Sequence, residues 1–158
     1  MISLTHLHVM VIHFPIALLY VAFFSELLGL ALKKSFFTDA AFYLLLLGTL
    51  GTIVSYLSGG YAADGIENGV LGKSIGMHEE AAIISLWLAI TTAVAYTAIV
   101  LFKYQQKWTK LLIVILFGSL IVSITRTAYL GGQLVYKHGA GVEIPSPVIK
   151  SSDSKLNQ

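Results

Sequence analysis

Four long runs of apolar residues alternate with short polar segments along this chain. The runs cover about 8–32, 40–60, 78–102 and 111–136, and each is bounded by charges, glycines or polar turns. A transmembrane helix needs about 20 apolar residues, so each run predicts one membrane-spanning helix. The connections are short, which predicts an all-α bundle of four transmembrane helices, up-down-up-down, over residues 1–142. Residues 143–158, with two prolines and a polar end, predict an extended C-terminal tail.

Composition supports a multi-pass membrane protein. Of the 158 residues, 56% are hydrophobic and only 11% are charged, whereas charged residues make up about a quarter of a typical soluble domain. The absence of cysteine excludes disulfides, thiolate metal sites, covalently attached c-type haem and iron–sulfur clusters on this chain. A net charge of +2 gives no indication of nucleic-acid binding.

The lysines of the short loops predict the orientation. Lys33 and Lys34 follow the first span, and Lys103, Lys107 and Lys110 lie between the third and the fourth, while no lysine or arginine precedes the first span. Because short cytoplasmic loops carry the excess of Lys and Arg, these two loops are predicted to be cytoplasmic. Both termini and the second loop are then on the outer, periplasmic side.

Histidines gather at one end of this predicted bundle. His6, His8 and His13 fall in the opening segment "THLHVMVIHFPIAL" (5–18), His78 begins the third span and His138 follows the fourth. Two imidazoles from different helices often hold haem iron in membrane bundles, so we expect one or two b-type haems near the outer face. The sequence favours His13 opposite His78, with His8 and His138 as a second pair or as contacts to haem propionates. For His6, solvation at the interface is the preferred interpretation.

The fourth span carries a polar stripe at helical spacing. Its members are Ser119, Ser123, Arg126, Gln133 and Lys137. A guanidinium in the hydrocarbon costs at least ~2.5 kcal/mol, so the stripe is predicted to face the bundle interior.

Arg126 then needs an anionic partner. Candidates are Asp64, Glu79, Glu80 or a haem propionate, and a purely structural ion pair is a comparable alternative. Glu26 is the other charge within a span, where Lys33 or Lys34 can reach it or where it can carry protons.

Small residues have two interpretations. Inward from His78 the stripe reads Ala82, Ser85, Ala89 and Thr92, and the second span carries glycines such as Gly59. Such residues allow close helix packing, the commoner role, and they also leave room for a flat ligand.

Three classes of function fit these patterns. The first is an electron-transfer protein that passes electrons between the quinone pool and an external c-type cytochrome or a larger respiratory complex. The second is a haem-free copper or zinc protein that uses the histidine cluster, with Met10 and Met77 nearby. The third is a structural or assembly subunit without a cofactor. A self-contained enzyme is disfavoured, because no nucleophile–base pair, phosphate loop or paired catalytic carboxylates are visible.

The segments "HVMVIHFPIALL" (8–19), "HEEAA" (78–82) and "GGQLVYKHGAGV" (131–142) resemble a known family. It is the bacterial family of small four-helix membrane proteins catalogued as domain of unknown function twenty-two thirty-one. The resemblance implies a bacterial inner-membrane protein similar to b-type cytochrome modules, and hence electron transfer. It also implies that His8, His13, His78 and His138 occupy the histidine positions of the family, whereas His6 has no counterpart.

Overall fold

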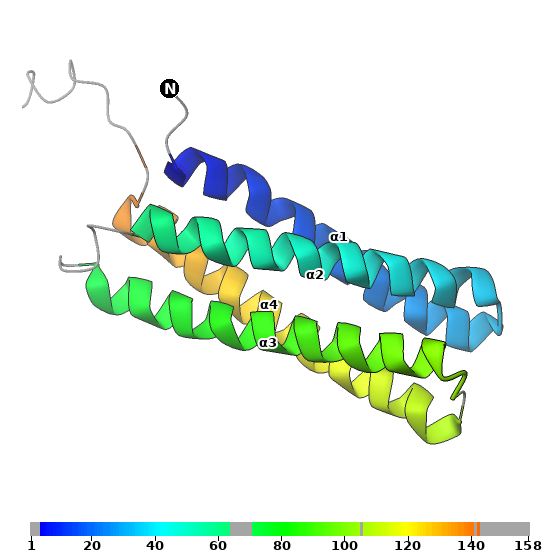
Figure 1. Ribbon diagram of the computed structural model, residues 1–158. Helices are drawn as coiled ribbons and strands as arrows, with labels where there is room; N and C mark the ends of the chain where they lie inside the picture. The colour runs from blue at the N-terminus through cyan, green and yellow to red at the C-terminus, as the bar shows by residue number, and fades with distance from the viewer. Residues whose placement is uncertain (1–3, 64–70, 105, 141, 143–158) are drawn as a thin grey trace, which may run out of the picture.

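Four long helices make up nearly all of the described chain. The computed structural model describes residues 4–63, 71–104, 106–140 and 142. Within these ranges the elements are α1 (Leu4–Leu32), α2 (Ser35–Ala63), α3 (Gly72–Leu101) and α4 (Lys107–His138) (Figure 1). All four are long and apolar enough to cross a membrane. The predicted all-α fold with four transmembrane helices is therefore confirmed.

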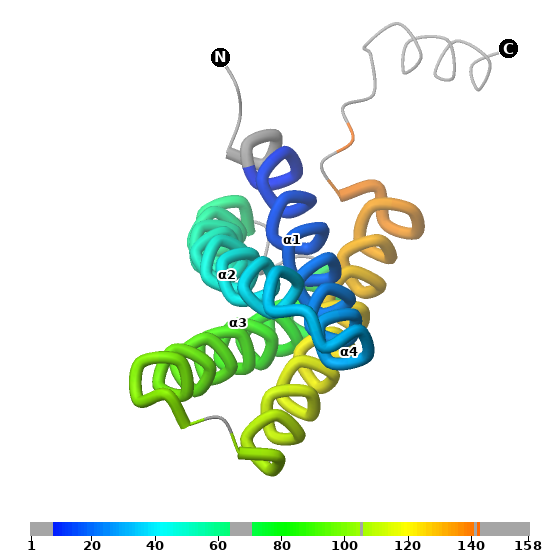
Figure 2. The backbone as a smooth tube through the Cα atoms, turned by 90° about the vertical axis from the view of Figure 1, so that its right-hand side faces the viewer, coloured from blue at the N-terminus to red at the C-terminus, as the bar shows by residue number. Residues whose placement is uncertain are grey.

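The helices form two antiparallel hairpins packed side by side. Helix α1 packs most extensively on α2, and α3 on α4, while α2–α3 and α1–α4 contacts join the two hairpins. Figure 2, viewed along the bundle, shows the consequence: α1 and α3 lie diagonally opposite each other. The start of α1, the end of α2, the start of α3 and the end of α4 share one end of the bundle, here called the terminal end.

Each hairpin turn begins in the same way. Lys33 follows α1 and Lys103 lies two residues after α3, and both adopt the left-handed conformation with φ of 53°. A left-handed residue stops a helix and lets the chain reverse. The end of α4 uses glycine instead, since Gly139 has φ of 64° and the amides of Gly139 and Ala140 bond back to Val135 and Leu134.

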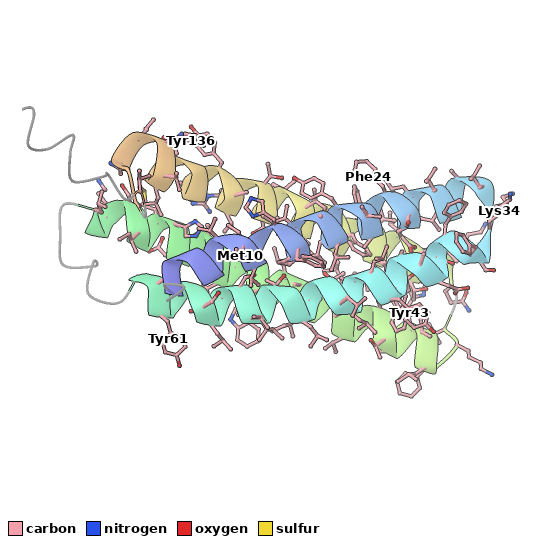
Figure 3. All side chains as sticks on the ribbon, turned by 90° about the horizontal axis from the view of Figure 1, so that it is seen from above. Met10, Phe24, Lys34, Tyr43, Tyr61 and Tyr136 are labelled. Carbon is pink, nitrogen blue, oxygen red and sulfur yellow. The ribbon has the colours of Figure 1, made fainter. Side chains whose placement is uncertain are left out.

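Large apolar side chains fill the interior of the bundle and also cover its outside. Leu19, Leu45 and Phe117 are completely buried. Phe24 and Tyr43, by contrast, are 58% and 64% exposed and point away from the helices (Figure 3). An apolar exterior on all sides is what a lipid solvent requires.

The helices extend further than the apolar runs. The second apolar run covers 40–60, whereas α2 covers Ser35–Ala63. The fourth run ends at 136, whereas α4 reaches His138. Hydropathy marks the part of a helix within hydrocarbon, but the backbone stays helical into the more polar interface. The predicted tail (143–158) and Asp64 lie outside the described residues.

Candidate functional site: a histidine pair between the hairpins

His8 lies in the contact between α1 and α2, with its ring over the backbone of Gly59. A Cβ atom added to Gly59 would stand 3.0 Å from Cε1 of His8, which is closer than a side chain tolerates. The ring is half-buried, and its Nδ1 lies 3.0 Å from the Ser58 hydroxyl oxygen. Glycine at position 59 therefore allows the imidazole to pack directly on α2.

His78 makes the same arrangement between α3 and α4. A Cβ atom on Gly131 would stand 3.1 Å from Cε1 of His78. The Nδ1 of His78 lies 3.1 Å from the backbone carbonyl oxygen of Thr127, four residues before Gly131. The half-buried ring thus rests on a glycine of the partner helix and bonds to that helix one turn earlier.

The two histidines lie at the same depth in the bundle. Thr49 of α2 bonds to the carbonyl of Ala89 of α3, which sets the register of these antiparallel helices. Ten residues from Thr49 towards the terminal end lies Gly59, against which His8 packs. Ten residues from Ala89 in the same direction lies Glu79, the neighbour of His78. The two imidazoles are on the diagonal helices α1 and α3.

The hydrogen bonds determine which ring nitrogen of His78 carries the proton. A carbonyl oxygen only accepts, so Nδ1 of His78 donates to Thr127 and its Nε2 has a free lone pair. The Ser58 hydroxyl lies 3.0 Å from the carbonyl oxygen of Ser55 as well as from Nδ1 of His8, and it has one hydrogen to donate. When that hydrogen goes to Ser55, the hydroxyl accepts from Nδ1 of His8, and Nε2 of His8 has a free lone pair too.

A buried hydroxyl beside this pair has no partner within the described chain. Ser55, four residues before Gly59, has a carbonyl oxygen near the His8 ring. Its hydroxyl oxygen is buried without any hydrogen bond to the described residues. Buried polar groups are nearly always paired, so this oxygen points to a partner outside the described residues.

The other predicted histidines are placed differently. His13 is exposed, and its Nδ1 lies 2.8 Å from the carbonyl oxygen of Val9 in its own helix. His138 is exposed too, with Nε2 3.4 Å from the hydroxyl oxygen of Ser74. The structure thus places His8 and His78 in half-buried positions between helices, whereas His13 and His138, the other members of the predicted pairs His13–His78 and His8–His138, are exposed. His6 is in α1, but its side chain is outside the described part.

The polar stripe of α4 does not face the interior as a whole. Ser123 does: its hydroxyl oxygen lies 2.8 Å from that of buried Ser85, which in turn lies 2.9 Å from the Thr127 hydroxyl. Arg126 and Ser119, however, are exposed on the outside of the bundle. The prediction that Arg126 faces the bundle interior is therefore wrong, because Arg126, three residues after Ser123, is turned by about 60° from it and so leaves the face that packs on α3.

Glu26 has a partner that the sequence analysis did not name. It is 3% exposed, and its carboxylate accepts a 2.6 Å hydrogen bond from the hydroxyl of Tyr96 on α3. Tyr96 also lies 3.2 Å from the carbonyl oxygen of Thr38. This group occupies the end of the bundle opposite to the histidine pair.

Sequence reasoning also missed the residues that support the histidines. The signal for them is a repeated doublet, "YLSGG" (56–60) and "YLGG" (129–132), near the end of each hairpin. In each doublet, a histidine of the preceding helix packs against the first glycine. The spacing from histidine to glycine is nearly the same in the two hairpins, 8 to 59 and 78 to 131.

A family model described as predicted membrane protein (DUF2231) matches residues 5–144. The chain belongs to this family. No curated protein and no solved structure matches the chain. The match covers both histidines, both glycines and all four helices of this DUF2231 protein.

Proposed function

We propose that this DUF2231 protein is a membrane-bound electron-transfer protein that holds one b-type haem between His8 and His78. One observation carries the proposal: two half-buried imidazoles lie at one depth on diagonal helices, and each has Nδ1 at a hydrogen-bonding group of the neighbouring helix, so that Nε2 would be the coordinating nitrogen. Haem iron takes two axial ligands from the protein, because the porphyrin supplies the other four.

The donor set suits haem better than a bare ion. Structural zinc is almost always held by four protein ligands. Within the described residues no group of three or more His, Asp or Glu side chains could hold a metal ion. A porphyrin leaves two coordination positions of the iron open, and a pair of imidazoles supplies two ligands. The unpartnered hydroxyl of Ser55 provides a further polar contact beside the pair.

The protein residues around the pair have separable tasks. The Thr127 carbonyl keeps Nδ1 of His78 protonated, and Ser58 would do the same for His8 by accepting from its Nδ1; both contacts fix the ring orientation. Gly59 and Gly131 give each ring the space to do so. When bound, haem supplies one-electron chemistry, and burial and axial ligation tune its potential.

The location of the site suggests its redox partners. The histidine pair lies in the terminal half of the bundle, which the loop lysines predict to be periplasmic. We propose that electrons pass between membrane quinone and a periplasmic c-type cytochrome or a larger respiratory complex in the bacterial inner membrane.

Removal of single histidines tests the proposal. Full-length wild type and the variants His8→Ala, His78→Ala, His13→Ala and His138→Ala are purified in detergent after expression with excess haem. We expect His8→Ala and His78→Ala each to lose at least nine-tenths of the reduced α band, while the exposed controls His13→Ala and His138→Ala keep it.

Other outcomes separate the alternatives. A haem-free wild type that binds stoichiometric copper or zinc by elemental analysis would support a metal-handling protein instead. Loss of the α band in His13→Ala, with an intact band in His8→Ala, would overturn the assignment of His8 while keeping the haem.

A further inference from the structure

The outer side of the α3–α4 hairpin carries a groove that the histidine site does not use. Its lining residues are Ile84, Ile115, Gly118, Ser119, Val122, Ser123 and Arg126. The groove has a volume of about 540 Å³ and is mostly apolar apart from the arginine at one end.

Arg126 lies within the membrane-spanning helix α4, away from both of its ends. It stands twelve residues before the end of α4 at His138, or about 18 Å along the helix. Its side chain is exposed on the surface that faces lipid. A lipid-facing guanidinium at this depth is costly, so a carboxylate partner is expected.

The chain itself carries a carboxylate at the depth of Arg126. Ser85 meets Ser123 and Thr127, and His78 meets Thr127, which places Arg126 level with residues 81–83 of α3. Glu80 is therefore within about 3 Å of the depth of Arg126. It is exposed and lies one helical turn from Ile84, on the side of α3 that borders the groove.

The surface between these charges is suited to close helix packing. Ser119 and Ser123 form a small-xxx-small pair in the groove. Beside them, a Cβ atom built on Gly118 would meet nothing within 4 Å, so that this face of α4 is open. Small residues of this kind let a second helix approach closely in lipid.

We infer that the α3–α4 groove is the interface of a symmetric homodimer, in which Arg126 of each copy binds Glu80 of the other. Two copies in one membrane share an orientation, so a twofold axis along the membrane normal preserves depth. Groups that pair across that axis must therefore lie at the same level, as Arg126 and Glu80 do. The contact is self-complementary and forms twice, which is typical of twofold interfaces. The inference does not depend on haem.

Charge exchange between two differently tagged copies tests this dimer. In co-purification from detergent, wild type is expected to pair with wild type. Arg126→Glu alone and Glu80→Arg alone should each reduce self-pairing at least fivefold through like-charge repulsion. Co-expression of Arg126→Glu with Glu80→Arg should restore pairing, because both contacts between the copies are then oppositely charged.

This mixture distinguishes a dimer contact from an ion pair within one chain. In the mixture each chain carries like charges at its own positions 80 and 126, so only contacts between copies can be rescued. Rescue by the double variant in one chain, without rescue by the mixture, would overturn the dimer in favour of an internal pair. The matched control is Glu79→Arg, which is exposed on the same turn but rotated by about 100° away, and should pair normally.

Disulfide cross-linking in native membranes tests the same interface without any change of charge. The chain has no cysteine, so Ser119→Cys introduces the only thiol. Oxidation should give a cross-linked dimer for Ser119→Cys but not for Leu50→Cys, which is 60% exposed on α2. A monomer in both assays, or Arg126-dependent capture of a different protein instead of a second copy, would overturn the inference.

Discussion

At the residue scale, two glycines decide where the imidazoles of His8 and His78 lie. Each ring occupies the space that a Cβ would fill on the facing helix. Each also bonds through Nδ1 to a group of that helix, Ser58 or the Thr127 carbonyl, so that Nε2 would be the coordinating atom in the proposed site. The glycines and the Nδ1 acceptors therefore matter as much to the proposed site as the histidines do.

Gly59→Ala and Gly131→Ala should each displace a histidine and lower the haem content by at least half, with the helices intact. The physical reason is an added methyl about 3 Å from the ring carbon. Neighbouring Gly60 and Gly132 are matched controls, since an added Cβ there meets nothing within 4 Å. Pyridine haemochrome assays on all four variants check this, and equal haem loss in the controls would contradict it.

Tyr96→Phe should lower the free energy of unfolding by about 1–2 kcal/mol, because it leaves the buried Glu26 carboxyl without its hydrogen-bond donor. Tyr20→Phe is the control, since its bond to the Thr125 hydroxyl lies among exposed groups. Unfolding in mixed detergent micelles measures both variants. A Tyr96→Phe protein as stable as Tyr20→Phe would show that the Tyr96–Glu26 bond contributes little.

At the element scale, the α1–α2 hairpin depends on very close helix contact. A Cβ on Gly29 would stand 2.5 Å from a methyl carbon of Thr38 and 2.9 Å from its backbone nitrogen. At Gly48 it would stand 2.6 Å from Leu19, which is fully buried. The tight turn at Lys33 and Lys34 requires this approach, since only these two residues separate the helices.

Gly29→Ala should therefore destabilise the protein, although alanine is the better helix former by about 1 kcal/mol. The backbone of Thr38 cannot yield without separating the two helices. Gly76→Ala, where an added Cβ meets nothing within 4 Å, should be neutral or slightly stabilising. Thermal unfolding in detergent gives the comparison, and an equal melting temperature for both variants would contradict this account of the hairpin.

The sequence predicts the four helices well, but it predicts only in part which residues of each helix face the interior of the bundle. Runs of apolar residues located all four helices, because hydrocarbon demands such runs. Of the predicted inward stripe Ala82, Ser85, Ala89 and Thr92, the last three are buried and Ala82 is half-buried. The prediction for α4 is wrong in part: Ser123 faces α3, whereas Arg126 is on the outside. A single sequence does not show whether a costly charge is buried within its own chain or, as in the dimer inferred above, between two chains.

The positions of the histidine side chains show the same limit of prediction from sequence. Topology placed His8, His13 and His78 in the same half of the bundle, as predicted. Which of them meet depends on rotation about each helix axis, and the rotation is set by packing against Gly59 and Gly131. A single sequence gives helical periodicity but not that rotation, so His13 was preferred to His8.

At the scale of the whole molecule, the protein is two similar hairpins with a site between them. Each has a left-handed lysine at its turn and a histidine that rests on a glycine. Because the hairpins contact each other less than the helices within each hairpin do, a flat cofactor inserted between the hairpins would cost the least packing. The proposed haem would join the two halves.

The predicted orientation is tested with single-cysteine variants. Tyr136→Cys, at a position 91% exposed near the end of α4, should react with an impermeant maleimide on intact cells. Ser35→Cys, at the start of α2, should react only after the membrane is opened. The opposite pattern would place the histidine pair on the cytoplasmic side and exclude direct transfer to a periplasmic partner.

The most direct test of the central claim is the haem stoichiometry and spin state of the purified wild-type protein. The arrangement of His8 and His78 predicts one haem b per chain, six-coordinate and low-spin in both oxidation states, with the spectral signature of two imidazole ligands. A protein that takes up no haem on reconstitution, or that binds it in a high-spin form with one histidine ligand, would contradict the account.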